Sequence, residues 1–218
     1  MMSPAEKPRR NLTGPVVPAV AAAALAAVLA LVVVGQKSGP RQVSTDCVLA
    51  GSETMGGPIS LIDVDGAAVT QADFKDQPSL VYFGYTHCPD VCPTTLYTVA
   101  QALREPGGYD VQPIMITVDP ARDTPAVMRQ YVHSGGFPAG LIGLTGSQAQ
   151  VDAAANAFKV FHQNHPIEGA PADAYNVDHS SLLYVMDKQW RTRAVINSVH
   201  TSPADIAQCI AAGLERRE

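Results

Sequence analysis

The feature that most constrains this chain is a charge-free strand that runs into a turn with two cysteines and then into a helix. Residues 79–85 are β-branched, aromatic and aliphatic, a composition typical of a buried strand, and Pro78 precedes them. Apolar residues then recur at the spacing of one helical face, at Cys92, Leu96, Val99, Ala100 and Leu103. The sequence therefore predicts a helix that has Cys92 in its first turn and ends before Pro106.

Two prolines and a glycine fit this geometry. Pro89 and Pro93 suit the start of a helix, because the first backbone N–H groups there have no partner and the φ of proline is already helical. Gly84 leaves room for close approach of the backbone at the end of the strand. Residues four apart share one face of a helix, so the sulfurs of Cys88 and Cys92 are expected on one side. A helix N-terminus favours the thiolate, so two thiolates are presented together at the edge of a sheet.

Three interpretations of the pair Cys88 and Cys92 compete. A purely structural disulfide is disfavoured, because a bridge across so short a loop constrains little of the unfolded chain. Zinc ribbons and fingers use a second pair of ligands at similar spacing, and Cys47 and Cys209 are not so spaced. A redox-active pair and a soft-metal site with one more ligand therefore remain open.

The segments around this unit predict an α/β domain. Among the strands, we expect a hairpin at 59–70 with its turn at Asp65-Gly66, single strands at 111–118 and 141–144, and a second hairpin at 181–186 and 192–197. Among the helices, we expect one from Thr124-Pro125 to about Ser134, one capped by Ser147 and a last one from Ser202-Pro203. Polar residues 161–178 are expected to form a long loop. The order predicts a thioredoxin-like fold, with an N-terminal β-hairpin and a central mixed sheet flanked by helices on both faces.

The N-terminal part has a different character. Residues 11–36 contain no charge, and 15–35 are rich in Ala, Val and Leu. As a helix, that segment would span about 30 Å, so we expect a transmembrane anchor. Lys7, Arg9 and Arg10 precede it, which by the positive-inside rule keeps 1–14 in the cytoplasm. The alternative is a cleaved signal peptide, which would have a shorter apolar core and a small-residue cleavage site.

The expected organisation is thus a cytoplasmic segment 1–14, an anchor 15–35, a tether 36–56 and a thioredoxin-like domain 57–218. This predicts a single-pass protein of the inner membrane with its soluble domain in the periplasm. The formal net charge of −5 and the lack of a basic tract argue against a nucleic-acid partner. Cys209 suits a helical core face, whereas Cys47 lies in the tether, where it is free, pairs between chains or pairs with Cys209.

Four motifs together resemble the Sco/SenC family. They are YFGYTHCPDVCPTTL at 82–96, GPISL at 57–61 followed by Asp63 and Asp65-Gly66, TVDPARDTP at 117–125 and VDHSS at 177–181. The first is long and specific. The resemblance implies a thioredoxin fold, copper binding and a role in assembling the copper centre of cytochrome c oxidase. Ile59, where Phe is common, and Gln189-Trp190, where Gly is often seen, depart from the family pattern.

A soft-metal site needs a third ligand besides the two cysteines. The chain has six histidines, and without the family resemblance the third ligand could be His87, His162, His165 or His179. The resemblance selects His179, whose position supplies the copper-binding histidine in the family. Asp119 and His87 are candidates to support the site from outside the ligand set, although Asp119 and Asp123 equally suit shaping the turn and capping the next helix.

The sequence therefore predicts a metallochaperone that binds Cu(I) or Cu(II) through Cys88, Cys92 and His179. A copper donor protein, the copper-site subunit of cytochrome c oxidase and a thioredoxin-like reductant are its expected partners. A thiol–disulfide oxidoreductase that reduces the oxidase cysteines, and a redox sensor, remain alternatives. A peroxiredoxin-like peroxidase is discounted, because Tyr85 and Val81 stand where its motif needs Thr and Pro.

Overall fold

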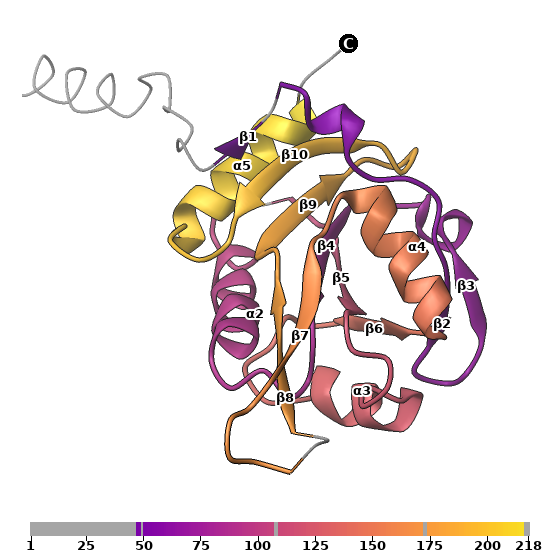
Figure 1. Cartoon of the computed structure of the whole chain (residues 1–218). Coiled ribbons are helices and arrows are strands. Elements are labelled where there is room, and N and C mark those ends of the chain that lie inside the picture. The colour runs from indigo at the N-terminus through magenta and orange to yellow at the C-terminus, as the bar shows by residue number, and fades with distance from the viewer. Residues whose placement is uncertain (1–46, 49, 107–108, 172–173, 216–218) are drawn as a thin grey trace, which may run out of the picture. The chain divides into compact units, whose positions relative to one another are not determined.

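The buried strand that the sequence predicts is β4 (Ser79–Gly84), and all of its residues are buried. The computed structural model describes residues 47–48, 50–106, 109–171 and 174–215, and it builds a mixed sheet of eight strands around β4 (Figure 1). β4 is parallel to β5 (Gln112–Thr117), and β5 is parallel to β6 (Ile142–Thr145). On its other side β4 pairs antiparallel with β9 (Leu182–Met186).

Both predicted hairpins are present and extend this centre. β9 continues into β10 (Thr192–Asn197), which also pairs with the short β1 (Cys47–Val48). At the opposite edge, β2 (Ser60–Asp63) pairs with β6 and with β3 (Ala68–Thr70). The strand order is β1-β10-β9-β4-β5-β6-β2-β3. The predicted thioredoxin-like α/β arrangement with a central mixed sheet is therefore confirmed.

Helices cover both faces of the sheet. They are α2 (Val91–Ala102), α3 (Pro125–Val132), α4 (Gln148–Phe158) and α5 (Pro203–Glu215), with short 3-10 helices η2 (Ser52–Thr54) and η3 (Gln71–Phe74). Phe83 contacts Phe158 of α4, whereas the next residue, Gly84, faces Cys92 of α2. Successive strand residues point to opposite faces, so α2 and α4 lie on opposite faces. α5 packs beside α2 (Figure 1).

The caps and turns follow from local chemistry. The side chain of Thr124 accepts a hydrogen bond from Val127 N–H and Pro125 opens α3, as predicted. Ser147 and Gln150 form a capping box on α4.

Trp190 occupies the glycine-like position of the β9–β10 turn with a φ of 61°. Its burial, its stacking on Phe74 and its hydrogen bond to the Gly57 carbonyl offset the cost of that conformation.

The long loop predicted for residues 161–178 is wrong. Residues there form β7 (His162–Pro166) and β8 (Tyr175–His179), a separate antiparallel pair that aligns His162 with His179. β7 is mostly exposed and its sequence, HQNHP, has no apolar alternation, so it carries no strand signal. β8 does alternate, with Tyr175 and Val177 inward and Asn176 and Asp178 exposed, but the pattern is too short to have marked a strand within a polar segment.

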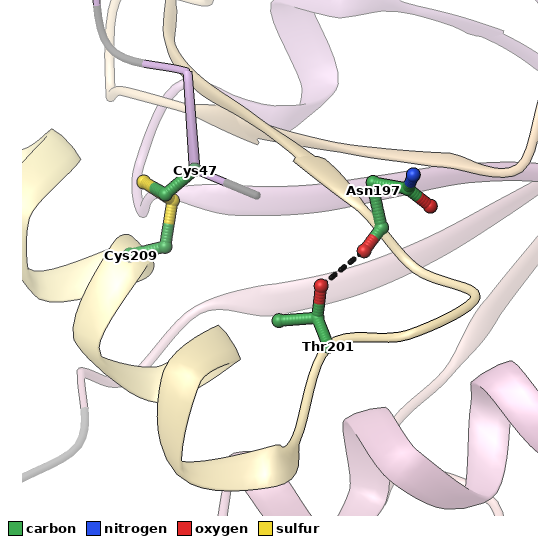
Figure 2. Close-up of a disulfide and its surroundings, with 4 residues drawn as sticks. All are labelled: Cys47, Asn197, Thr201 and Cys209. Atoms are coloured by element: carbon green, nitrogen blue, oxygen red, sulfur yellow. Dashed lines mark hydrogen bonds between the residues drawn. A yellow bond between two sulfur atoms is a disulfide. The ribbon is translucent and has the colours of Figure 1, made fainter. Parts of the chain in front are cut away.

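A disulfide joins Cys47 to Cys209, which selects one of the three states that the sequence leaves open for Cys47. It connects β1, within the expected tether, to the buried face of α5 (Figure 2). Nearby, the Thr201 hydroxyl donates to the carbonyl of Asn197 and closes the turn between β10 and α5. The edge strand β1 is thus bonded covalently to the last helix.

The expected localisation requires a correction. None of the helices among the described residues combines the length and the hydropathy that a bilayer-spanning helix requires. The longest of them, α5, has 13 residues and would extend about 20 Å. The predicted placement as a single-pass inner-membrane protein with a periplasmic domain is therefore not retained. Segment 15–35, on which that prediction depends, lies outside the described residues, as does 1–14.

Candidate metal centre

The two free cysteines lie where β4 leaves the sheet and α2 begins. A turn closed by the hydrogen bond from Cys88 N–H to the Tyr85 carbonyl carries Cys88, and α2 starts at Val91. Cys88 thus precedes the helix, whereas Cys92 lies in its first turn. Cys88 is half-buried and Cys92 is fully buried. One sulfur is open to solvent and the other lies against the core.

The backbone and a distant histidine bring further groups to the sulfurs. Cys92 N–H donates to Cys88 Sγ at 3.3 Å. The ring of His179, at the end of β8, places Nε2 3.4 Å from Cys92 Sγ. Its Nδ1 lies 3.1 Å from the carbonyl oxygen of Ser180, which can only accept, so we assign the proton to Nδ1 and a lone pair to Nε2. The structure therefore gathers Cys88, Cys92 and His179.

The environment makes the two thiols chemically different. A hydrogen bond from the Cys92 thiol lowers the pKa of Cys88 to about 4, burial opposes this, and the Cys92 backbone N–H adds to the lowering. The same Cys88–Cys92 hydrogen bond, together with burial, raises the pKa of Cys92 well above its ordinary value. Cys88 is therefore the thiolate of the pair at neutral pH, and Cys92 is the proton donor.

A cleft of about 270 Å³ opens beside these groups, and Cys88, Val91, Asn176 and His179 are among its lining residues. The rings of Tyr82 and Tyr85 meet His179 edge-on, with centroid distances of 6.2 and 5.9 Å. Aromatic contacts of this kind fix the orientation of the imidazole ring. The site is thus open at the cleft, while the two tyrosine rings hold the imidazole ring of His179 in place.

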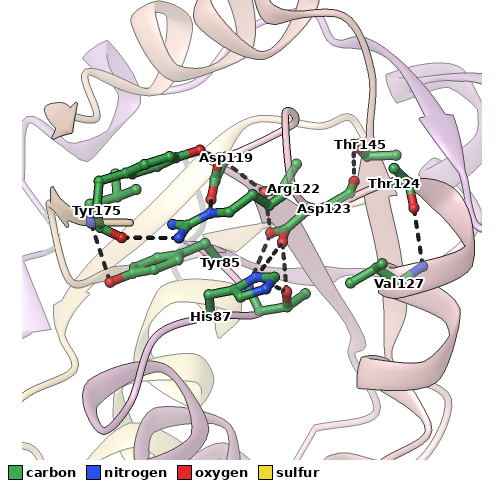
Figure 3. Close-up of polar contacts among 12 residues, drawn as sticks. Tyr85, His87, Asp119, Arg122, Asp123, Thr124, Val127, Thr145 and Tyr175 are labelled. Atoms are coloured by element: carbon green, nitrogen blue, oxygen red, sulfur yellow. Dashed lines mark hydrogen bonds and ion pairs between the residues drawn. The ribbon is translucent and has the colours of Figure 1, made fainter. Parts of the chain in front are cut away.

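His87 and Asp119 lie in a neighbouring cluster. His87 is half exposed, with Nδ1 3.7 Å from a carboxylate oxygen of Asp123. One ligand atom from each of His87, Asp119 and Asp123 lies within 4.8 Å of the others (Figure 3). Asp123 accepts hydrogen bonds from the side chain and backbone of Thr86 and from Thr117. Burial raises the pKa of the Asp123 carboxyl, and these hydrogen bonds oppose the shift. This cluster ties the cysteine turn to the end of β5.

The sequence reasoning missed Arg122 and Tyr175. Arg122 donates to Asp119 and to the Tyr175 carbonyl, and the Tyr175 hydroxyl donates to Asp119 at 2.7 Å (Figure 3). Arg122 belongs to the TVDPARDTP motif, which was the available signal. Tyr175 was missed because its segment was expected to be a loop, although Tyr175 and Val177 alternate there with the polar Asn176 and Asp178.

The other histidines are engaged elsewhere or exposed. His162 lies 3.3 Å from Asp152, His165 lies 3.0 Å from Asp178, and His133 contacts the Arg129 carbonyl. His200 is exposed.

The two sulfurs of Cys88 and Cys92 and the imidazole of His179 form a donor set that suits a soft metal ion such as Cu(I). The same two sulfurs can also form a disulfide with each other.

Comparisons with known proteins agree on one family. The family model described as SCO1/SenC matches residues 49–215. Protein SCO1 homolog 1, mitochondrial, of Arabidopsis thaliana is 40% identical over 143 residues, which cover 64% of this chain and 41% of that protein. Protein SenC of Rhodobacter capsulatus is 44% identical over 141 residues, 63% of this chain and 61% of that protein. The chain thus spans less than two thirds of the length of these two relatives.

A solved structure extends the likeness to the fold. The crystal structure of Arabidopsis thaliana ScoI with copper bound superposes with a TM-score of 0.67 at 34% sequence identity. The match covers 73% of this chain and 97% of that chain. Given these matches, this chain belongs to the SCO1/SenC family.

Proposed function

We propose that this protein binds one copper ion through Cys88, Cys92 and His179 and delivers it to the copper-site subunit of cytochrome c oxidase. The observation that supports the ligand set is the gathering of both sulfurs and the imidazole, with Cys92 Sγ 3.4 Å from His179 Nε2. The relative of known structure, Arabidopsis ScoI, has copper bound. The oxidase as recipient is what the Sco/SenC resemblance implies.

The chemistry of the donors supports copper as cargo. Thiolates and an imidazole favour Cu(I), and the imidazole also suits Cu(II). Cys88 supplies a thiolate at neutral pH, and a soft cation would displace the proton of Cys92. Because the site opens into a cleft, a ligand of the recipient has a path to the ion. A copper donor protein and a thioredoxin-like reductant are further expected partners.

One observation favours a second function. A thiolate at Cys88 beside a protonated thiol at Cys92 is the arrangement of a nucleophilic and a resolving cysteine. In a thiol–disulfide oxidoreductase, Cys88 would attack the disulfide of the substrate to form a mixed disulfide and free one substrate thiol. Cys92 would then attack Cys88 Sγ, which breaks the mixed disulfide and releases the second substrate thiol. Both sulfurs would end as a Cys88–Cys92 disulfide, and the substrate would be reduced.

Copper titration of the full chain separates the two functions. His179→Ala and Cys88→Ser should each weaken copper binding by at least about tenfold, because even groups around a metal ligand are commonly worth about 10–100-fold. His133→Ala is the matched control and should bind like the wild type. Oxidation of the Cys88–Cys92 pair should abolish binding. If His179→Ala binds copper as tightly as the wild type and still reduces disulfides, the oxidoreductase function replaces the proposed one.

Transfer is tested separately. Copper-loaded protein mixed with the metal-free copper-site subunit of cytochrome c oxidase should lose its copper to that subunit. Retention of copper in the presence of excess recipient would contradict delivery.

A further inference from the structure

β8 is attached to the domain through side chains. Among the described strands, its backbone pairs with β7 alone, and this pair is separate from the main sheet. The strand alternation leaves Asn176 and Asp178 exposed and turns Tyr175, Val177 and His179 toward the domain. The position of His179 therefore depends on what holds Tyr175 and Val177 on one side, and on the backbone hydrogen bonds of Ser180 and Ser181 to Phe161 and Ser198 on the other.

Arg122 holds the end of β8 that is far from His179. Its guanidinium carbon lies 3.7 Å from the centroid of the Tyr175 ring, and its Nη1 donates to the Tyr175 carbonyl at 3.0 Å. Its Nε donates to Asp119, whose other carboxylate oxygen accepts from the Tyr175 hydroxyl. The ring, the carbonyl and the hydroxyl of Tyr175 are thus all fixed by the segment between β5 and α3 (Figure 3).

Tyr85 holds the middle of the strand. Its hydroxyl oxygen accepts a hydrogen bond from Val177 N–H at 3.3 Å. The Arg122 guanidinium lies 5.8 Å from the centroid of the Tyr85 ring, and the same ring meets His179 edge-on. A continuous set of contacts therefore runs from Arg122 through Tyr175 and Tyr85 to His179.

From these contacts we propose that Arg122 and Tyr175 are positioning residues that clamp β8 at the place where His179 reaches Cys92. Arginine suits this task because its planar guanidinium stacks on a ring while donating hydrogen bonds in a fixed fork, which an ammonium group cannot do. The inference rests on the proposed function for the ligand role of His179, whereas the clamping of β8 is measurable without metal.

The first experiment measures the clamp in the metal-free full chain. Hydrogen exchange of the Val177 amide, followed by NMR, should accelerate by about tenfold or more in Arg122→Ala, because the strand opens more often. Tyr175→Leu should do the same, whereas Tyr175→Phe keeps the stacked ring and should stay close to the wild type. Arg122→Lys keeps the charge beside Asp119 without the stacking, and it should resemble Arg122→Ala.

The matched control is Arg129→Ala. Arg129 also joins a carboxylate, Asp65 at 2.8 Å, and a backbone carbonyl, that of Val64, but it lies on α3 and contacts the β2–β3 turn. Its removal should leave exchange at Val177 unchanged.

The second experiment adds Cu(II) and records the electron paramagnetic resonance spectrum. Nitrogen coupling from His179 should be present in the wild type, absent in His179→Ala and weakened in Arg122→Ala. Cu(II) affinity should fall by about tenfold in Arg122→Ala, since groups that orient a metal ligand carry effects of this size.

If the Val177 amide of Arg122→Ala exchanges at the same rate as that of the wild type, the proposed clamp is wrong. Full restoration by Arg122→Lys would also overturn it, because neutralising Asp119 would then suffice. If the spectra of the wild type and His179→Ala agree, the proposed ligand set fails, and exchange at Val177 still decides on the clamp. If Arg122→Ala does not fold, Tyr175→Leu and Arg122→Lys provide the same comparison.

Discussion

At the scale of single residues, the two sulfurs of the cysteine motif differ although they stand four positions apart. Cys88 lies before the helix, is half-buried and accepts a hydrogen bond from Cys92 N–H. Cys92 lies in the first turn of α2, where the core buries it completely. Burial disfavours a charged sulfur, whereas the helix N-terminus and the backbone N–H favour it, so the negative charge resides on Cys88.

This difference predicts selective alkylation. In the reduced protein, iodoacetamide should modify Cys88 in mildly acidic solution and leave Cys92 unmodified. Because the pKa of Cys88 is lowered to about 4, its thiolate forms as the pH rises through that value, and the rate should then level off. Peptide mass spectrometry after short labelling at a series of pH values measures both sites. A rate that rises only near the ordinary thiol pKa of about 8.5 would contradict the assignment.

At the scale of elements, the site depends on how closely the end of β4 approaches the first turn of α2. The sequence predicts that Gly84 permits this approach, and the structure confirms it. A Cβ atom at Gly84 would lie 2.7 Å from the Tyr82 ring and 3.2 Å from Cys92 Sγ. Strand and helix therefore meet with no space for a methyl group.

Gly84→Ala is accordingly expected to displace Cys92. It should lower the free energy of unfolding by about 1–3 kcal/mol, the usual cost of overpacking, and weaken copper binding under the proposed function. Urea unfolding and copper titration measure the two effects. Gly135→Ala is the matched control, because a Cβ there meets nothing within 4 Å. Identical behaviour of the two variants would show that the approach is not tight.

At the scale of the whole molecule, the Cys47–Cys209 disulfide closes nearly the whole described chain into one loop. The two cysteines are 162 positions apart, and the bond fastens β1 at the sheet edge to α5. A cross-link over so long a loop removes much of the freedom of the unfolded chain. The first and last elements of the domain are thereby held together.

Loss of this bond should lower stability without altering the metal site. Cys47→Ser is expected to reduce the free energy of unfolding by about 2–4 kcal/mol, with about 5 kcal/mol as the chain-entropy limit. Copper affinity should stay unchanged, because Cys88, Cys92 and His179 come from other elements. Val48→Ala, which alters the exposed neighbour on β1 and keeps the disulfide, is the control. An unchanged urea midpoint in Cys47→Ser would refute the role of the bond.

The sequence by itself determined the unit that carries the cysteines and the order of the main elements. Residues 79–103 specify strand, turn and helix through local composition and spacing, and Thr124-Pro125 and Ser147 mark helix starts through contacts with their immediate neighbours. Such signals lie within a few residues of each other, so they can be read without knowing the fold.

Only the tertiary structure decided which distant groups meet. β7 has no apolar alternation and that of β8 covers only five residues, so neither strand stood out in the sequence. The clamp of Arg122 on Tyr175 joins segments 53 positions apart. The partner of Cys47 and the separation of His87 and Asp119 into their own cluster likewise depend on packing between remote segments. A chain encodes such contacts in the sum of its interactions rather than in any local pattern, which is why they become visible only in the folded molecule.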